Sequence, residues 1–473
     1  MSIKPTIMKF GGTSVADATA FKRVANIVQT QIAQRPVVVV SAMSGFTDTL
    51  LHCFELSLND QVFFAMAQLN EELERHRDVV LSFGGETAAV DYDSVLQETR
   101  ENLRLVFNEA KLPEASLLSL KDQVVSCGEQ LSSELLARVL QTFGISAIHV
   151  DARDVIVTDE EYTRANPLMV ETAYQASQLV MPLVQAGQVP VLGGFIGSTA
   201  SGNTTTLGRG GSDYSAAILG GALDAREIQI WTDVSGVLTA DPRVVKDART
   251  VPVLSYQEAA ELAYFGAKVL HPKTIHPAVE RSIPVRVCNS HAPTEPGTLV
   301  VAESEAAPQT VKAIAHKNGI TTLQVTSSRM LGAYGFLRAL FEVFDVHRTV
   351  VDVVTTSEVS VSLSVDDTST LAELVTALEK FGAVEVEGHR TIISVIGEGL
   401  RNTSGIAAMI FSALNDINIS MISFGASSIN LTFMVEEACA AEAIWRLHRV
   451  CFESEVFEPV QVVKARAAGE SAA

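Results

Sequence analysis

The stretch TIMKFGGTSVADATAFKRVANIV, residues 6–28, joins a short apolar run to a segment with helical periodicity. Its first three residues are typical of the end of a buried strand, and apolar residues recur at helical spacing from Phe21 onward. The loop Gly11–Ser14 should therefore lie where backbone N–H groups at a helix N-terminus can bind an anion, and Lys9 adds a positive charge beside it. For this loop alone, an ordinary glycine-rich turn between a strand and a helix is the alternative.

Other apolar runs predict further strands, and their nearly continuous apolar character fits a sheet covered by helices on both faces: 36–40, 189–192, 227–231 and 283–287. Residues 50–112 show a polar helical pattern instead, which indicates a helical excursion between strands. The predicted class is therefore α/β, and in such sheets ligands bind at the carboxyl ends of the strands.

The composition limits the classes of partner. A net charge of −20 and a pI near 4.9 argue against nucleic acid or an anionic membrane surface. No apolar run reaches about 18 residues, so we expect no membrane span. The five cysteines are scattered without a C-x-x-C pair, and no signal peptide or transit peptide fits before the first strand. We therefore expect a protein of the reducing cytoplasm.

Four polar clusters follow predicted strands: 41–48, 204–217, 231–244 and 265–275. In the second cluster Arg209 stands between glycines, and such a guanidinium suits bidentate capture of a carboxylate or phosphate. A solvated loop with a helix-capping Ser-Asp pair is the alternative for this cluster. His271 and His276 have no carboxylate at a metal-binding spacing, so we expect no metal site.

Six motifs resemble, in order and spacing, the aspartate kinases of the amino-acid-kinase fold: KFGGTSVAD, SCGEQLSS, TTTLGRGGSDYSAA, WTDVSGV, DPRVV and FGAKVLHP. The resemblance is to the monofunctional, lysine-sensitive type. It implies a three-layer α/β sandwich over residues 1–298 and transfer of the γ-phosphate of MgATP to the side-chain carboxylate of L-aspartate, the first step of lysine, threonine and methionine synthesis. That carboxylate is already ionised at neutral pH, so catalysis needs positioning and charge neutralisation rather than a general base.

The resemblance also implies a role for each site residue. Lys9 would neutralise the transferring phosphoryl group and Asp213 would orient that lysine, while Arg209 would bind the α-carboxylate of aspartate and Glu129 its ammonium. The full set of implied aspartate contacts is Thr47, Glu129, Arg209, Gly210, Gly211 and Ser212. The implied ATP contacts, with Mg²⁺ carried by the nucleotide, are Lys9, Gly11, Gly12, Ser14, Thr232, Asp233, Arg243, Lys268 and Val269.

The sequence departs from the family pattern in two places, residues 237–238 and residue 127. Val237 and Leu238 stand where Ile-Tyr is common, so an aromatic contact to the nucleotide is expected to be missing. Cys127 stands where histidine is frequent, and because this chemistry needs no nucleophilic side chain we assign it no catalytic role.

The last third of the chain contains an internal repeat. A shift of 70 residues brings Leu323 onto Ile393 and Gly335 onto Gly405, and each unit has the pattern strand, glycine-containing loop, helix and two strands. Units at 311–385 and 386–465 resemble the paired, ferredoxin-like α+β ACT domains of the family, and exchange of a strand between them, over 311–315, is expected. Residues 466–473 should form a flexible tail.

The first ACT unit carries a predicted effector site. Its segment VDVVTTSEVSV, residues 351–361, resembles the lysine-binding segment of lysine-inhibited aspartate kinases. The implied effector contacts are Met330, Asp352, Thr356, Ser357 and Glu358. Ala333, Tyr334 and Val350 depart from the expected surroundings, which leaves threonine open beside lysine as effector, and polar sheet-edge residues are the non-functional alternative. We expect a homodimer or tetramer formed through these units.

Two other functions compete with this interpretation. Kinases of the same fold act on glutamate, acetylglutamate or nucleotides, but a glutamate facing an arginine suits a zwitterion such as aspartate. An idle amino-acid sensor that keeps the fold as a scaffold has no need of the charged set Lys9, Arg209, Asp213 and Lys268.

Overall fold

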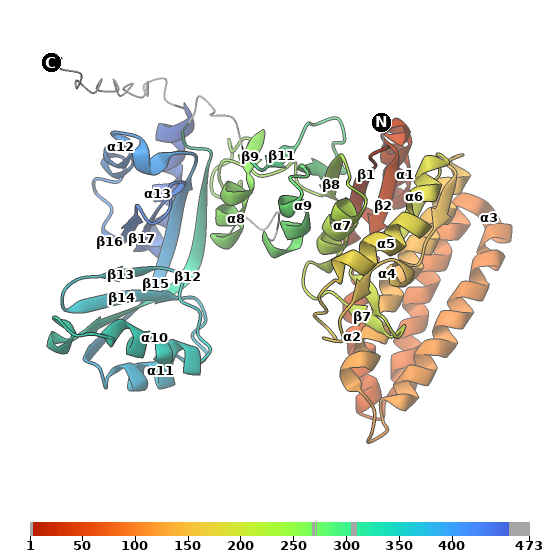
Figure 1. Ribbon diagram of the computed structural model, residues 1–473, viewed down its shortest axis with the longest axis horizontal. Coiled ribbons are helices and arrows are strands. Elements are labelled where there is room, and N and C mark those ends of the chain that lie inside the picture. The colour runs from red at the N-terminus through yellow and green to blue at the C-terminus, as the bar shows by residue number, and fades with distance from the viewer. Residues whose placement is uncertain (1–2, 267–269, 271, 304–309, 454–473) are drawn as a thin grey trace, which may run out of the picture. The chain divides into compact units, whose positions relative to one another are not determined.

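The computed structural model describes residues 3–266, 270, 272–303 and 310–453 (Figure 1). The chain forms two compact units. The first takes its described residues from 1–237, 250–260 and 268–304, and the second from 238–249, 261–267 and 305–473. Lys268, Val269, His271 and the predicted tail 466–473 lie outside the described residues.

An eight-stranded sheet forms the centre of the first unit, in the order β3-β5-β2-β1-β8-β10-β11-β9. Neighbouring strands from β3 to β10 are parallel, whereas β11 is antiparallel to β10. The strands are β1 (Thr6–Phe10), β2 (Pro36–Val40), β3 (Ala147–His149), β5 (Val189–Gly193), β8 (Glu227–Thr232), β9 (Val253–Ser255), β10 (Val285–Asn289) and β11 (Thr298–Val301). All four apolar runs predicted as strands coincide with or overlap a strand of this sheet.

Helices pack on both faces of the sheet, so the unit has three layers. The helices are α1 (Ala18–Thr30), α2 (Phe46–Leu58), α3 (Val62–Glu109), α4 (Leu117–Thr142), α5 (Met169–Leu179), α6 (Met181–Gln185), α7 (Gly211–Ala222) and α9 (His276–Glu280). A further helix, α8 (Tyr256–Tyr264), begins in this unit, and its residues 261–264 belong to the second unit. Met8 and Phe10 of β1 belong to a core shared with α1 and α4, whereas Ile7 points toward Gly220 of α7. This alternation along one strand is the period-2 pattern of a sheet buried on both sides, and it confirms the α/β prediction.

A long helical hairpin interrupts the alternation of strands and helices. Helix α3 bends sharply at Gly85, whose φ of 66° and ψ of −169° lie outside the helical region, and its two arms pack against α2 and α4 (Figure 1). Only glycine adopts this backbone conformation without strain, so Gly85 allows the reversal. The hairpin confirms the helical excursion expected between residues 50 and 112.

A small three-stranded sheet, β4-β6-β7, lies beside the main sheet within the first unit. Its strands are β4 (Val157–Thr158), β6 (Ile196–Thr199) and β7 (Thr204–Thr206). Strand β7 leads directly into the glycine-rich loop before α7, so the small sheet determines where that loop begins.

A six-stranded sheet forms the second unit, in the order β13-β14-β12-β15-β17-β16. Its strands are β12 (Ala313–Thr326), β13 (Val354–Thr356), β14 (Ser360–Val365), β15 (Ala383–Ile396), β16 (Ile419–Phe424) and β17 (Asn430–Glu436), and its helices are α10 (Phe336–Val346), α11 (Leu371–Leu378), α12 (Ile406–Ser412) and α13 (Glu437–His448). The long strands β12 and β15 run through both repeats, so residues 313–317 pair with residues 392–396 of the second repeat.

Two equivalent apolar cores lie against this sheet. The first contains Leu323, Leu340, Phe344 and Leu363, and the second contains Ile393, Ile410, Leu414 and Phe433, in the register of the 70-residue shift. Two side chains of the 238–249 segment, Ala240 and Val245, complete the second core, and Thr239 Oγ1 lies 2.9 Å from Nε2 of buried His448. The paired units confirm the predicted ACT-type architecture.

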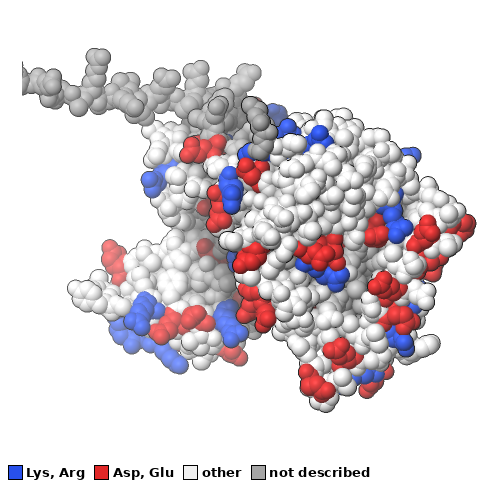
Figure 2. Space-filling model, turned by 45° about the vertical axis from the view of Figure 1, so that its right-hand side comes forward, with Lys and Arg blue, Asp and Glu red and all other residues white. Residues whose placement is uncertain are grey.

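On the face shown in Figure 2, acidic and basic side chains are interspersed and no continuous basic patch covers the described residues. Among the described residues, no helix is long and apolar enough to span a membrane.

Candidate active site

A cavity of about 780 Å³ opens at the carboxyl ends of β1 and β2 in the first unit. It brings together the loop after β1, two of the four polar clusters that follow predicted strands (41–48 and 204–217), and the α4 helix. Of the predicted site residues, it is lined by Lys9, Gly12, Thr47, Glu129, Arg209, Gly210, Gly211, Ser212 and Asp213. The cavity therefore contains every residue of the predicted aspartate set.

Lys9 and Asp213 form an ion pair in this cavity although 204 positions separate them, from residue 9 to residue 213. Strand β1 positions the lysine and the first turn of α7 positions the aspartate, with Lys9 Nζ 2.6 Å from Asp213 Oδ1. The two atoms are close as an ion pair but lack the alignment of a hydrogen bond. Both side chains are only partly exposed, at 12% and 19%. The helix N-terminus further favours the carboxylate there.

The loop that carries Arg209 depends on close backbone packing. Gly208 and Gly210 have φ values of 75° and 73°, and a Cβ at Gly211 would lie only 2.5 Å from Cδ2 of Phe195. Arg209 is exposed and forms no ion pair within the described part of the chain. Its guanidinium is thus available to bind an anionic group in the cavity.

Glu129 is the acidic residue of the predicted aspartate set. It lies on α4, is 4% exposed, and its Oε2 atom has no hydrogen-bond partner among the described residues. Burial raises the pKa of its carboxyl group to about 8, although hydrogen bonds with the backbone and the charge of Lys9 oppose the shift. A buried carboxyl group with one oxygen that lacks a hydrogen-bond partner can bind a cationic group.

Four further predicted nucleotide contacts, Gly11, Ser14, Thr232 and Asp233, lie at or just after the ends of β1 and β8, which are adjacent parallel strands. The Gly11 N–H donates to the Trp231 carbonyl at 3.3 Å, and the Ser14 hydroxyl lies 3.3 Å from that of Ser290. Thr232 ends β8 and donates from Oγ1 to Asp233 at 3.1 Å. Gly11, Ser14, Thr232 and Asp233 do not line the cavity itself, so their nucleotide contacts stay predictions.

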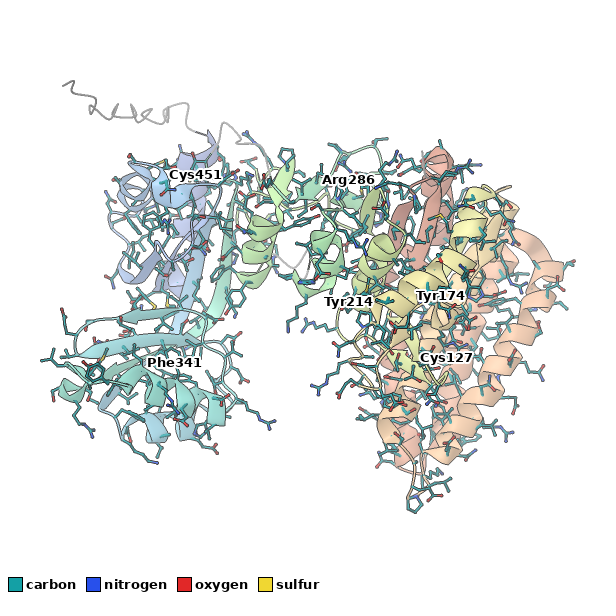
Figure 3. All side chains as sticks on the ribbon, in the orientation of Figure 1. Cys127, Tyr174, Tyr214, Arg286, Phe341 and Cys451 are labelled. Atoms are coloured by element: carbon teal, nitrogen blue, oxygen red, sulfur yellow. The ribbon has the colours of Figure 1, made fainter. Side chains whose placement is uncertain are left out.

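Arg243 belongs to the second unit, where it forms an ion pair with Asp241 at 2.6 Å. Its predicted contact with the nucleotide therefore stays a prediction, as do those of Lys268 and Val269. Cys127 lies on α4 (Figure 3), and burial raises the pKa of its thiol to about 12, which argues against a nucleophilic role. Within the described ranges, no group of three or more His, Cys, Asp or Glu residues could hold a metal ion.

Comparison with known proteins gives the chain its family. The amino acid kinase family model matches residues 4–289 and an ACT domain model matches residues 393–450. Aspartokinase 3, chloroplastic, of Arabidopsis thaliana is 39% identical over 96% of this chain and 83% of its own length. Lysine-sensitive aspartokinase 3 of Escherichia coli is 39% identical over 94% of this chain and 99% of its own length. The chain belongs to the aspartokinase family.

The fold agrees with this assignment. The crystal structure of E. coli aspartokinase III in complex with lysine and aspartate, in its T-state, matches with a TM-score of 0.80 and 37% identity, over 95% of this chain and 99% of that one. The protein is thus an aspartokinase that transfers a phosphoryl group from ATP to the side-chain carboxylate of L-aspartate. A cavity with a lysine, an available arginine and a buried glutamate fits an acceptor that is a zwitterion carrying a second carboxylate.

In the second unit of the aspartokinase, the predicted effector residue Asp352 is held by two internal partners. Its side chain is 2% exposed, and its Oδ1 atom accepts from Lys317 Nζ at 3.0 Å and from the Tyr264 hydroxyl at 2.8 Å. Its Oδ2 atom has no hydrogen-bond partner among the described residues. Lys317 also contacts Asp366 at 2.7 Å, so this ammonium is shared between two carboxylates.

The other predicted effector residues lie on nearby elements of the same repeat. Thr356 ends β13, and Ser357 and Glu358 follow in the turn before β14, where the hydroxyls of Ser357 and Ser360 lie 2.8 Å apart. Met330 ends a short 3-10 helix, Ser328–Met330, and packs against the first repeat's core. Their contact with an effector stays a prediction.

The cavity also contains residues that the sequence analysis missed. Phe195 lines it with a positive φ of 66°, and Asp122 lies seven residues before Glu129 on α4. Two positions seven apart fall on the same face of a helix, so the spacing from Glu129 was a usable signal for Asp122. The conformation of Phe195 had no signal in the sequence.

Proposed function

We propose that the aspartokinase holds L-aspartate between Glu129 and Arg209, with the buried carboxylate receiving the α-ammonium and the guanidinium binding the α-carboxylate. The single observation that carries this proposal is that an unpartnered, 4%-exposed carboxyl group and an arginine without an ion-pair partner in the described residues line the same cavity. Thr47, Gly210, Gly211 and Ser212 complete the surroundings of the substrate.

The side-chain carboxylate of aspartate then attacks the γ-phosphate without help from a general base. Lys9 offsets the negative charge that the two anions bring together, and Asp213 fixes the position of the lysine ammonium through their 2.6 Å contact. We propose that Mg²⁺ enters bound to the nucleotide phosphates. The nucleotide itself is proposed to contact Gly11, Gly12 and Ser14 of the loop between β1 and α1, where the N–H groups of Gly11 and Ser14 already donate to the Trp231 and Gly11 carbonyls.

We further propose that L-lysine inhibits the enzyme by binding the first ACT repeat at Asp352. Support comes from the unpartnered, buried Oδ2 atom of Asp352 and from the E. coli relative, which is named lysine-sensitive and was crystallised with lysine. Met330, Thr356, Ser357 and Glu358 are the proposed further contacts. Partly exposed Ile422 and Phe424 on the edge strand β16 support assembly of a homodimer through the ACT sheet. Five free cysteines support the expected cytoplasmic location.

Substrate analogues test the aspartate site directly. Succinate lacks the ammonium that Glu129 is proposed to receive, and β-alanine lacks the α-carboxylate that Arg209 is proposed to bind. Both should be phosphorylated with a kcat/KM at least tenfold below that of L-aspartate, because each lacks one of the two charged groups that Glu129 and Arg209 are proposed to bind. Phosphorylation of either analogue as efficient as that of L-aspartate would reject the proposed contacts.

A further inference from the structure

Asp122 occupies a position that the catalytic proposal does not use. It lies on α4 with a side chain that is 0% exposed, and its carboxylate accepts three hydrogen bonds from the chain. Oδ2 accepts from the Thr163 N–H at 2.8 Å and from the Thr206 N–H at 3.0 Å, and Oδ1 accepts from the Thr206 hydroxyl at 2.7 Å.

These bonds hold two segments that meet at the Arg209 loop. Thr206 is the last residue of β7, and only Leu207 and Gly208 separate it from Arg209. The Thr163 segment packs against the same place, because its carbonyl oxygen is 3.2 Å from where a Cβ on Gly208 would be. The Ala165 N–H also donates to the Thr206 carbonyl at 2.9 Å. Asp122 therefore fixes both sides of the start of this loop.

Thr163 needs such a partner because its backbone is strained. Its φ is 69°, a left-handed conformation that side chains branched at Cβ rarely adopt. Strained residues persist where surrounding contacts over-determine them, and they cluster at functional sites. The bond from the Thr163 N–H to Asp122 is the contact that holds this residue toward α4.

The same helix also carries Glu129, seven residues later and on the same face. We propose that Asp122 is a positioning residue for aspartate recognition. It ties the loop that carries Arg209 to the helix that carries Glu129, and so sets the separation of the two groups that hold the zwitterion. Asp122 borders the cavity but exposes no surface to solvent, and both of its oxygens already accept hydrogen bonds, so it acts through the loop and not on substrate. The inference rests on the proposed role of Arg209.

The test compares steady-state KM values for aspartate and ATP in the full chain. Asp122→Ala should raise the KM for aspartate at least tenfold and leave the KM for ATP within twofold. Asp122→Asn should recover most of the loss, because its amide oxygen can accept both N–H groups while its amide NH₂ donates to the Thr206 hydroxyl. An Asn variant as impaired as the Ala variant would overturn the proposal, because the charge itself would then act on substrate.

A matched pair on β7 keeps the test decisive if Asp122→Ala does not fold. Thr206→Val removes one bond to Asp122, whereas Thr205→Val removes one equally buried bond, the 2.7 Å contact of Thr205 with Thr158. Only Thr206→Val should raise the KM for aspartate, by about fivefold. Equal KM values in the two variants, or a parallel rise for both substrates, would overturn the positioning role. Arg209→Ala with an unchanged KM for aspartate would instead reject the proposed substrate site itself.

Discussion

The buried carboxyl group of Glu129 makes aspartate binding depend on pH. Burial raises its pKa to about 8 in the ligand-free enzyme, so the group is mostly protonated at pH 7. Only the ionised form can pair with the α-ammonium of aspartate, and below pH 8 most binding events must therefore expel a proton. The experiment varies the pH across this range and compares the KM for aspartate of the native enzyme with that of Glu129→Gln.

The size of the effect follows from the pKa. One pH unit below it, about one group in eleven is ionised, which costs about 1.4 kcal/mol of binding free energy relative to the ionised enzyme. Between pH 8.5 and pH 6 the ionised fraction falls roughly 80-fold, so the KM for aspartate should rise by a similar factor. The KM for ATP should not follow this dependence, because Glu129 lies in the proposed aspartate set.

A coupled assay of ADP formation at half-unit steps of pH gives the KM values. Calorimetry in buffers with different ionisation enthalpies should show release of about 0.9 proton per aspartate bound at pH 7. Glu129→Gln should show a higher KM, by roughly tenfold to a hundredfold at pH 8.5, because a hydrogen bond between charged groups is lost, and no pH slope. A native KM that changes less than threefold over this range, or a Gln variant that keeps the native slope, would show that ionisation of Glu129 does not control aspartate binding.

Three further predictions concern stability, catalysis and regulation. The pKa of Glu129 in the folded enzyme lies above its ordinary value of 4.5, so the contribution of this group to stability is present below pH 4.5 and is lost as the pH rises to about 8. Over this range the free energy of unfolding of Glu129→Gln should rise relative to that of the native enzyme by roughly 1.4 kcal/mol per pH unit. A difference between the two enzymes that stays constant with pH in denaturant titrations would contradict this. Lys9→Ala should lower kcat by about 10² to 10³ in steady-state assays, since it removes the cation beside Asp213, and a loss below tenfold would exclude the assigned role. Asp352→Ala should raise the lysine concentration for half-inhibition more than about tenfold, whereas Asp366→Ala, which also loses a contact with Lys317, should not; equal shifts would remove Asp352 from the effector site.

Much of the fold was predictable because its signals are local. The strands β2, β5, β8 and β10 are short apolar runs bounded by polar clusters, and the two ACT repeats share a register that the 70-residue shift exposes. The sharp bend at Gly85 was not predictable, because a glycine inside a helical pattern can equally be tolerated without a turn. Membership of residues 238–249 in the second unit depends on long-range packing of Ala240 and Val245.

The candidate site was predictable as a set of residues but not as a geometry. The motifs predicted that Lys9, Arg209 and Asp213 belong together, while the 2.6 Å contact of Lys9 with Asp213 comes from the order of strands around β1. The burial of Glu129, which decides its pKa, depends on packing of α4 against the sheet. The spacing of Asp122 from Glu129 indicates a shared helix face, but its role was missed because its hydrogen-bond partners on β7 come only from the tertiary structure.

The assignment of this cavity as the site of phosphoryl transfer is tested most directly by measuring ADP release from MgATP. The measurement uses the native enzyme and Lys9→Ala, each with and without L-aspartate and with and without L-lysine. Turnover should require L-aspartate, fall by at least about a hundredfold in Lys9→Ala, and be suppressed by L-lysine. Turnover that does not require aspartate, or that survives in Lys9→Ala, would contradict the assignment of this cavity as the site of phosphoryl transfer. Aspartate-dependent turnover that L-lysine leaves unchanged would contradict the effector assignment alone.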